Sequence, residues 1–472
     1  MFDMTGRLTA LIAGVLYLIG LTAGTAWADH HIVYVPSPNG TDDTANIQLA
    51  LDTCVQQHPG GCTIQLASGT YLTRQIVVSN FRGTLKGIGI GSTVIDALPN
   101  LPVNFYFDGS NACVPNTTTC LWNTLMVFLE GDISISDLSV HMKATDGTAT
   151  SPPGQIETAI RLMGQYPTNV HIDRVEMEGS PDSTSPFGFN VGNGIMYTGE
   201  INSSPNPLAA PCGAPLGFYF LSGSYTVRNS SFRFMSNGVS QDGCVRSSQV
   251  TIGGSPSTGN SFRDLNTGID LESAENSHFE VSYNTCSGIG FGMWVIPWFS
   301  SLFLPSKPSR YSIHNNYFST TGTYGTGIYL YNEPGYPWIN ASILNNAITL
   351  QNNFSDGIDV INTRGTAVIN NRIAGTGYEG IGLWASSSDQ VIGNNVASYR
   401  PDPSVGIAQI NLDPSSNQDH VVCFSPSDTV LNQGSNNWVN GCHEIATAPK
   451  AAGKFSVPQR LLPRRKHSPF VF

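Results

Sequence analysis

A small residue followed by an aliphatic one recurs along most of the chain, and alternating positions follow each pair. From residue 159 onward the pairs begin at Ala159, Gly194, Gly238, Gly268, Gly288, Gly327, Gly357, Gly380 and Gly406. The shortest intervals are 20 residues, from 268 to 288, and 23 residues, from 357 to 380. Longer intervals contain Pro-, Gly- and Ser-rich insertions. A fixed period with insertions is typical of a solenoid whose coils stack on one another.

A second series places an asparagine three residues after an aliphatic residue and shortly before the next pair. Its members are Asn284, Asn316, Asn346, Asn371 and Asn395, and earlier coils have Leu138, Val175 and Ser230 at this position. Stacked parallel strands put equivalent residues about 4.8 Å apart, so these amides can hydrogen-bond from coil to coil. The regular recurrence favours a structural ladder over a ligand site.

A helix is predicted before the repeats, over residues 43–58. Asp43 is a suitable N-cap, Gly60-Gly61 ends the segment, and apolar residues recur at helical spacing. This helix can cover the open end of a stacked sheet, whose unpaired edge would otherwise favour aggregation. Short strands are predicted after it, at 63–66 and 69–72.

Residues 42–95 resemble the opening of the pectin-lyase-like superfamily. The shared features are an Asp-Asp-Thr helix start, the Gly-Gly segment, a Leu-x-x-Gly-Thr-Tyr strand pair from Leu66, and a Leu-x-Gly turn at Leu85. The resemblance implies a right-handed coil, but not an activity, because the superfamily includes lyases, hydrolases, epimerases and phage tailspikes.

The repeats and the resemblance together predict an all-β fold. We expect a single-stranded right-handed parallel β-helix with a short N-terminal capping helix, in a domain spanning 29–445 whose coils occupy about 60–445. A β-propeller is the rival architecture, but its four-stranded antiparallel blades are longer than the observed intervals.

The two ends of the chain have different compositions from the repeats. Arg7 precedes an apolar run that is short for a membrane span, and Ala26-Trp27-Ala28 is a suitable cleavage site, so residues 1–28 are predicted to be a signal peptide. The mature chain is therefore expected to be secreted or periplasmic, without a membrane span. The Pro-rich, basic tail 446–472 is predicted to be disordered. A net charge of −11 argues against nucleic acid as a partner. The sequence does not indicate an oligomeric state.

Nine cysteines fit an oxidising compartment. The predicted disulfides are Cys54–Cys62, Cys113–Cys120, Cys212–Cys244 and Cys423–Cys442. Cys286 is left over and is expected to be a free thiol in the core. The spacings of cysteine and histidine do not match a zinc site, so no metal site is predicted.

Aligning the coils on their Gly-Ile pairs brings three acids together on the outward face. Asp242 and Glu272 then lie one coil apart, about 5 Å between Cα atoms, and Asp270 lies about 7 Å from Glu272 along the same strand. Mutual repulsion raises the pKa of one member of such a group. Two carboxyls with different pKa values are what acid–base cleavage of a glycosidic bond requires. Asp242, Asp270 and Glu272 are therefore the predicted catalytic residues.

The same alignment places glycines and aromatic residues beside these acids. Glycines would let a polymer approach the backbone, aromatic rings could contact sugar rings, and a further acid could bind hydroxyls. The insertions 199–224 and 297–310, the latter with Trp298, Phe299 and Phe303, could form the walls of a groove. The predicted substrate-binding residues are Gly290, Gly292, Trp294, Tyr329, Tyr331, Asp359 and Trp384.

Motifs of individual families in the superfamily do not fix the activity. Of the four polygalacturonase motifs, Asn266-Thr267-Gly268 partly matches Asn-Thr-Asp, and the repeats match none of the others. The Asp-Pro-His-Asp motif of mannuronan epimerases is absent. Pectate lyases use an Arg or Lys base with a Ca²⁺-binding acid cluster, whereas the outward columns contain only Arg161. These observations favour a glycoside hydrolase acting on a polysaccharide without a cofactor. The alternatives are a polysaccharide lyase of the pectate-lyase type, which could use Ca²⁺, or a non-catalytic carbohydrate-binding adhesin.

Overall fold

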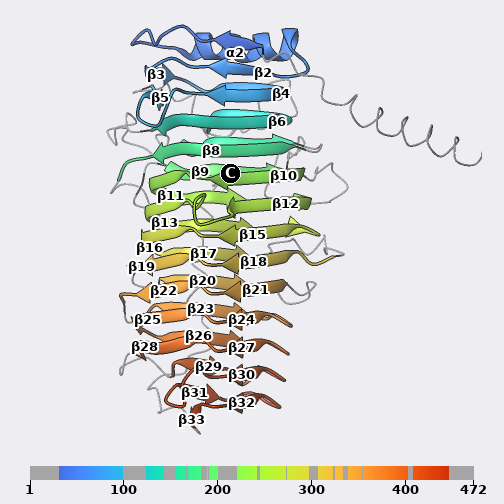
Figure 1. Ribbon diagram of the computed structural model, residues 1–472, viewed down its shortest axis with the longest axis vertical. Helices are drawn as coiled ribbons and strands as arrows, with labels where there is room; N and C mark the ends of the chain where they lie inside the picture. Colours follow the sequence, from blue (N-terminus) through green and yellow to red (C-terminus); the bar gives the residue numbers. More distant parts are fainter. Residues whose placement is uncertain are drawn as a thin grey trace, which may run out of the picture.

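The described residues form a tall stack of parallel coils, and a helix lies over the N-terminal end of the stack (Figure 1). This computed structural model describes residues 31–98, 124–142, 156–164, 168–181, 189, 191–199, 221–241, 245–272, 274–296, 307–322, 325–332, 339–352, 354–401 and 408–445. Each coil contributes strands to three sheets, and each strand pairs in parallel with its equivalent in the next coil, as β17 does with β20. The predicted fold class, a right-handed parallel β-helix with a capping helix, is confirmed.

We number the three sheets in the order in which a coil passes through them. Sheet I contains β1 (Ile32–Tyr34), β2 (Cys62–Gln65), β10 (Leu221–Arg228), β12 (Val245–Gly253), β14 (Ala274–Glu275), β15 (His278–Ser282), β18 (Arg310–His314), β21 (Asn340–Leu344), β24 (Ala367–Ile369), β27 (Gln390–Ile392), β30 (His420–Val422) and β32 (Trp438–Asn440). Sheet II contains β3 (Gly69–Thr73), β5 (Thr93–Ala97), β16 (Thr285–Ile289), β19 (Tyr317–Thr320), β22 (Ala347–Leu350), β25 (Arg372–Gly377) and β28 (Asn395–Pro401). Sheet III contains β7 (Ile156–Gly164), β9 (Val191–Gly199), β17 (Phe291–Ile296), β20 (Thr326–Tyr331), β23 (Asp356–Ile361), β26 (Glu379–Trp384), β29 (Ile410–Leu412), β31 (Thr429–Asn432) and β33 (His443–Ile445). Longer strands bend from one sheet into the next: β4 (Ile76–Lys86), β6 (Thr124–His141), β8 (Asn169–Glu178), β11 (Ser231–Gln241) and β13 (Ser261–Glu272).

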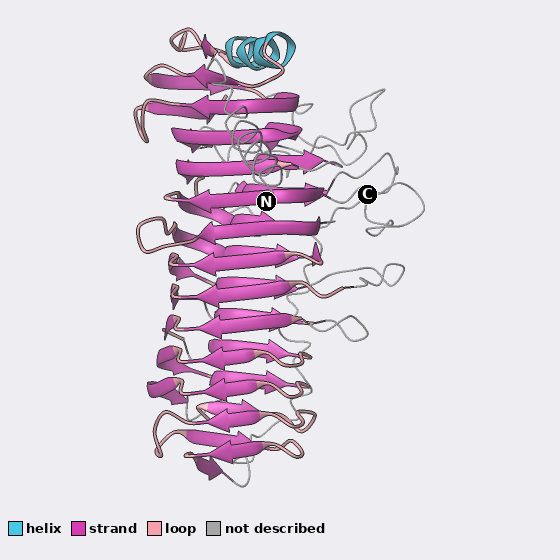
Figure 2. Ribbon diagram, turned by 45° about the vertical axis from the view of Figure 1, so that its right-hand side comes forward, coloured by secondary structure: helices cyan, strands magenta, loops and turns pink. Residues whose placement is uncertain are grey.

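Helix α2 (Thr44–Gln57) covers the first coil (Figure 2). It buries Ile47, Ala50, Leu51 and Cys54 against the stack, and a disulfide from Cys54 to Cys62 ties it to β2. The helix thereby shields the apolar interior at this end from water. None of the helices in the described ranges is long and apolar enough to cross a membrane.

The predicted cysteine chemistry is confirmed where the structure describes it. Cys54–Cys62 and Cys423–Cys442 are disulfides, and Cys286 is a buried free thiol. The other two predicted pairs, Cys113–Cys120 and Cys212–Cys244, lie outside the described residues, as do the predicted signal peptide and the tail 446–472.

Buried asparagines line the turn between sheets I and II and bond from coil to coil. Each amide Nδ2 donates to the Oδ1 of the next asparagine at 2.9–3.0 Å, along the series Asn260, Asn284, Asn316, Asn346, Asn371 and Asn394. Each Nδ2 also donates to a backbone carbonyl, so these buried amides are satisfied. The predicted structural ladder is confirmed, and Ser230 extends it toward the N-terminus.

Two positions of the ladder differ from the prediction. Asn394 takes the place expected for Asn395, because Val391 rather than Ile392 faces the core and shifts the frame by one residue. Asn260 is an additional member that the spacing did not indicate, since a turn over 254–259 separates it from the aliphatic residue of its coil.

Replacing Asn346 by leucine is expected to lower the free energy of unfolding by about 1–3 kcal/mol. The change removes the acceptor of Asn316 and the donor to Asn371 in a buried turn. Thermal or denaturant unfolding measures the effect, with the exposed Asn340→Leu as a control expected to stay within about 0.5 kcal/mol of the parent. A fully stable Asn346→Leu variant that had lost glycan affinity would instead assign the ladder to ligand binding.

Candidate active site

The pairing in sheet III corrects one step of the alignment used to find the site. Ile269 pairs with Met293, and Asp270 pairs with Trp294, so the coil repeat runs through Gly292-Met293 and not through Gly288-Ile289. Ile289 belongs to the end of β16 in sheet II. The sequence contains two pairs of a small and an apolar residue four positions apart. Gly288-Ile289 matched the repeat better than Gly292-Met293, because the other pairs have an aliphatic residue where Met293 stands.

Gly290 and Gly292 therefore do not form a bare outward strip beside the acids. A Cβ on Gly292 would lie 2.3 Å from the Phe318 ring and 2.4 Å from the Gly327 carbonyl oxygen, so this glycine lies where the packed coil leaves no room. A Cβ on Gly290 would lie 2.9 Å from the carbonyl oxygen of Asn266. Both glycines are explained by packing, and their predicted role in substrate binding stays without support from the geometry.

Asp270 and Glu272 lie near each other on β13, as predicted, and both are buried. The Asn237 amide donates to Asp270 Oδ2 at 3.0 Å and to Asn193 Oδ1 at 3.1 Å, which links three neighbouring strands. Asp242 lies outside the described residues, so its contact with Glu272 stays a prediction.

An aromatic cluster follows Asp270 on the next two strands. Trp294 and Tyr329 stack with ring centroids 4.4 Å apart, Phe291 packs edge-on to Trp294, and Tyr331 lies parallel to Tyr329 at 6.5 Å. Trp294 and Tyr329 are 9% and 4% exposed, so these two rings are buried against each other and not presented as open platforms. Tyr331 is half-buried.

Three carboxyls meet beyond the aromatic cluster, where β23 and β26 lie side by side. Asp356 pairs with Glu379, and Asp359 pairs with Tyr329 on one side and Gly382 on the other. Asp356, Asp359 and Glu379 each place an oxygen within 4.8 Å of the others, and they are 4%, 2% and 1% exposed. We call these three residues the acid triad. Its centre lies three strands from Asp270, roughly 14 Å along the stack.

Trp384 and Asn411 orient Glu379. The indole Nε1 of Trp384 donates to Glu379 Oε1 at 2.8 Å, and the Asn411 side chain also hydrogen-bonds to Glu379. Gly382 makes the indole contact possible, because a Cβ there would lie 2.3 Å from Glu379 Oε1 and 2.5 Å from Trp384 Nε1. The outward glycine that matters is therefore Gly382, which lies inside the triad.

Burial gives the triad unusual proton affinity. Desolvation raises the pKa of Asp359 to about 7, against hydrogen bonds from Glu379 and Asp356 that lower it. Desolvation also raises the pKa of Asp356 and of Glu379, and the negative charge of Asp359 adds to both shifts. One oxygen of each carboxyl lacks a donor from the protein, namely Asp356 Oδ1, Asp359 Oδ1 and Glu379 Oε2. Asp359 is therefore partly ionised near neutral pH, and burial favours the protonated forms of Asp356 and Glu379.

Another pair of buried acids shows what a structural role looks like in this fold. Asp389 accepts hydrogen bonds from the Thr363 hydroxyl at 2.6 Å and from the Thr366 backbone at 2.7 Å. Asp419 accepts from Ser386 and from the backbone of Asp389. Burial raises the pKa of Asp389 to about 7 as well, yet its oxygens are bonded to the turn that it organises. The acid triad differs because one oxygen of each of its carboxyls has no hydrogen-bond partner in the protein.

Asp356 and Glu379 were missed by the sequence analysis, although Asp359 was proposed as a substrate contact. Both occupy the position just before a Gly-Ile pair, in Asp356-Gly357-Ile358 and Glu379-Gly380-Ile381. That position also faces outward and pairs from coil to coil. Extending the aligned columns by one residue toward the N-terminus would have shown both acids.

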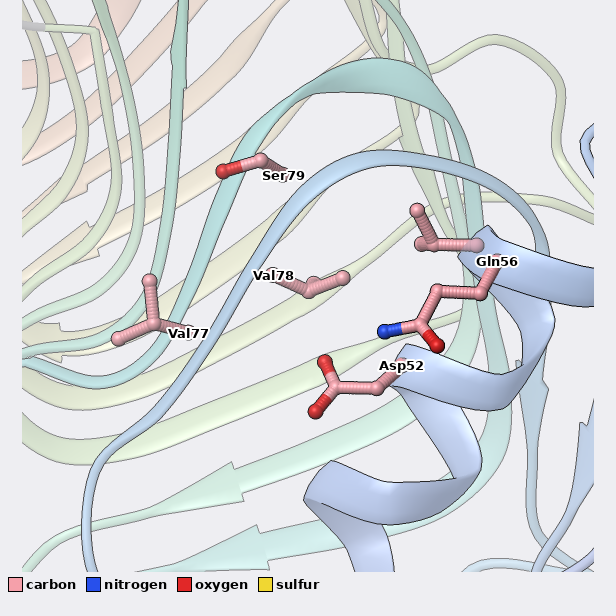
Figure 3. Close-up of a pocket in the computed structure, with 6 residues that line it drawn as sticks. Asp52, Gln56, Val77, Val78 and Ser79 are labelled. Carbon is pink, nitrogen blue, oxygen red and sulfur yellow. The ribbon is translucent and has the colours of Figure 1, made fainter.

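A second group of possible metal ligands lies on β6 and β8 and consists of His141, Glu176 and Glu178. Its members already contact other residues or one another, because Arg233 forms an ion pair with Glu178 at 2.6 Å and His141 contacts Glu176 at 3.1 Å. A pocket of about 290 Å³ lies between α2 and β4, lined by Asp52, Val55, Gln56, Val77, Val78 and Ser79 (Figure 3). This pocket is formed where helix α2 packs on the first coils, and no residue of the acid triad lines it.

Comparisons with known proteins agree with this architecture. Residues 38–270 match the family model described as rhamnogalacturonase A/epimerase, pectate lyase-like. A search of curated proteins finds no match. Among solved structures, DFA-IIIase from Arthrobacter chlorophenolicus A6 in complex with GF2 aligns over 84% of this chain and 95% of its own, at 12% identity and a TM-score of 0.51. The A-module of mannuronan C-5 epimerase AlgE6 from Azotobacter vinelandii aligns over 86% and 96%, at 13% identity and a TM-score of 0.40. At these identities the likeness concerns the fold.

Proposed function

This chain is a pectin-lyase-like right-handed parallel β-helix protein, and we propose that it is a polysaccharide-active glycoside hydrolase centred on the acid triad. The observation that carries the proposal is the set of three buried carboxyls with raised pKa values and oxygens that no protein donor satisfies. Such groups destabilise a fold, so they are retained where protonation and deprotonation serve chemistry. The family model and the carbohydrate-related names of the structural neighbours support the same substrate class.

The proposed reaction assigns a proton donor and a proton acceptor within the triad. Glu379, held by Trp384, gives its proton to the glycosidic oxygen as the bond from the anomeric carbon to that oxygen breaks. Asp359 in its ionised form removes a proton from water as the water oxygen bonds to the anomeric carbon, or attacks that carbon first. Asp356 is the third carboxyl, and burial together with the charge of Asp359 raises its pKa and so favours its neutral form. One water is consumed, and the two carboxyls then exchange the proton through solvent.

The triad is buried, so a substrate contacts it only after displacing the atoms that cover it. The insertions 297–306, 333–338 and 402–407 adjoin sheet III in sequence and lie outside the described residues. Asp242, Asp270 and Glu272 stay the catalytic residues predicted from sequence, and the aromatic cluster lies on the strands between Asp270 and the triad. The triad is preferred because its three acids have oxygens within 4.8 Å of one another.

A polysaccharide lyase is the alternative that the donor set also permits. Three carboxylate oxygens within 4.8 Å suit Ca²⁺, which prefers oxygen ligands, and Ca²⁺ would neutralise a uronate carboxylate there. Among the outward residues of the described sheet III strands, only Arg161 could serve as a cationic base, and it is buried beside Met196 on distant strands. The hydrolase proposal needs no cofactor and is therefore preferred.

We expect purified protein to release reducing ends from at least one polysaccharide without added metal. The test is a panel of polysaccharides in EDTA, with reducing ends and the ultraviolet absorbance of unsaturated products read in parallel. Reducing ends without unsaturated products support hydrolysis, and the two signals together with a calcium requirement would support the lyase. Binding without either signal would favour the carbohydrate-binding adhesin. We also propose that the protein is secreted or periplasmic, which the two disulfides among the described residues support.

A further inference from the structure

A row of buried oxygen acceptors without donors runs across four neighbouring strands of sheet III, from β20 to β29. Two of these atoms, the Thr326 hydroxyl and the Asn411 carbonyl oxygen, lie outside the triad. Thr326 pairs with Asp356, and Asn411 pairs with Gly382, so they flank the triad on either side. Buried polar atoms are almost always satisfied by protein, water or ligand, so this row is able to accept hydrogen bonds from the hydroxyl groups of a bound sugar. Its members are Thr326 Oγ1, Asp356 Oδ1, Asp359 Oδ1, Glu379 Oε2 and Asn411 Oδ1.

The same face lacks the cations that an acidic glycan would require. On the described strands from β13 to β29, the outward positions of sheet III hold no lysine or arginine. Arg161 lies six strands from Asp359, roughly 29 Å away, and is buried beside Met196. The sequences of the insertions 297–306, 333–338 and 402–407 also contain no lysine or arginine. Arg364 is exposed in the turn that follows β23, and Arg400 is exposed near the end of β28, where it pairs with Thr376 of sheet II.

The negative charge of this site favours an uncharged polysaccharide over an acidic one. A uronate carboxylate beside Asp359 would place like charges together in a buried, weakly screened site, where repulsion is strong. Proteins bind such carboxylates through paired contacts from arginine or through lysine. The hydroxyl groups of an uncharged sugar instead donate hydrogen bonds to the acceptor row and add no charge.

We propose that the glycan bound at the acid triad is uncharged, so the substrate is a neutral polysaccharide and not a polyuronide. This inference rests on the proposed site and names its substrate class. The acceptor row contacts sugar hydroxyls, and Thr326 belongs to the binding surface although it takes no part in proton transfer.

The first test compares neutral and uronate oligosaccharides of equal length by calorimetric binding to the intact protein, in EDTA, at low and moderate salt. Neutral glycans are expected to bind with affinity that changes less than about twofold with salt, since no ion pair is formed. Arg364→Ala is expected to bind them as the parent does. Any of three results would overturn the proposal. The first is uronate binding that weakens with salt and with Arg364→Ala, the second is uronate binding that requires added calcium, and the third is that no neutral glycan of the panel binds.

The second test replaces Thr326 by valine, which keeps the shape and removes the acceptor. We expect affinity for the neutral glycan to fall about 2- to 10-fold, the range for one neutral hydrogen bond. Thr320→Val is the matched control, because its hydroxyl is also buried without a partner but lies on β19 in sheet II. Equal affinity in the Thr326→Val variant would remove the row from the binding surface. A neutral glycan that binds but is never cleaved would leave the substrate class standing and reject the hydrolase.

Discussion

Glu379→Gln is expected to lower kcat by about 10²–10⁴ on the polysaccharide identified by the screen, with the fold and glycan affinity retained. Glutamine keeps an oxygen that can accept from Trp384 and has the size of glutamate, but it carries no transferable proton. If Glu379 protonates the leaving oxygen, the loss appears in kcat and not in KM. Initial rates at saturating substrate, with circular dichroism as a check on folding, measure the effect.

Two further variants make this result specific. Asp389→Asn changes another buried acid whose pKa burial raises to about 7, but one bonded within a turn, and it is expected to leave kcat within about twofold of the parent. Glu272→Gln tests the site predicted from sequence. Loss of turnover in Glu272→Gln with full activity in Glu379→Gln would move the catalytic centre to β13. Full activity in Glu272→Gln and in Glu379→Gln would reject acid catalysis at this face.

The fold could be predicted from the sequence because every coil of the solenoid requires the same residue types at the same positions. Each coil needs a small residue where a neighbouring coil packs closely, as at Gly357, where a Cβ would lie 2.2 Å from the Gly380 carbonyl oxygen. Each coil also needs a buried amide at the turn between sheets I and II, as at Asn316 and Asn346. These demands repeat with every coil, so a single sequence reveals them.

The acid triad was less accessible because it depends on register at single positions. A shift of the repeat by a few residues at β17 changes which side chains neighbour Asp270, and Met293 in place of isoleucine concealed the true frame there. Asp356 and Glu379 were hidden for a different reason, since the outward face continues to the residue before each glycine. Burial of the outward carboxyls could not be read from the pattern either, because alternation predicts that such positions face water.

The pattern of apolar and polar residues gave no indication of the contact that orients Glu379. Trp384 was predicted to contact sugar, which stays a prediction, and its indole nitrogen donates a hydrogen bond to Glu379. The contact depends on the missing side chain at Gly382 and on two residues five positions apart on one strand. Sequence spacing gives no sign of such a bond, because residues of one strand separated by an odd number ordinarily face opposite sides.

Asp359→Asn is expected to raise the thermal stability of the protein at pH 7 and to change it little near pH 4. The pKa of Asp359 is about 7 in the folded protein and 3.8 in an unfolded chain. Below 3.8 both states hold the proton, so the carboxyl causes no difference. Between the two values the unfolded chain is ionised and the folded protein is not, so stability falls as the pH rises and the loss is complete above about pH 7.

The interval between those pKa values corresponds to roughly 4 kcal/mol, an upper limit for the gain because asparagine replaces the hydrogen bonds of Asp359 only in part. Thermal unfolding at pH 4, 5.5 and 7 measures the trend, and the more exposed acid Asp264, replaced by asparagine, should show no comparable rise. A gain in stability together with lost turnover would mark Asp359 as a residue kept for function at the expense of the fold. A variant with the same change in stability at every pH would mean that the pKa of Asp359 is the same in the folded and unfolded protein, and the raised proton affinity assigned to the triad would be wrong at Asp359.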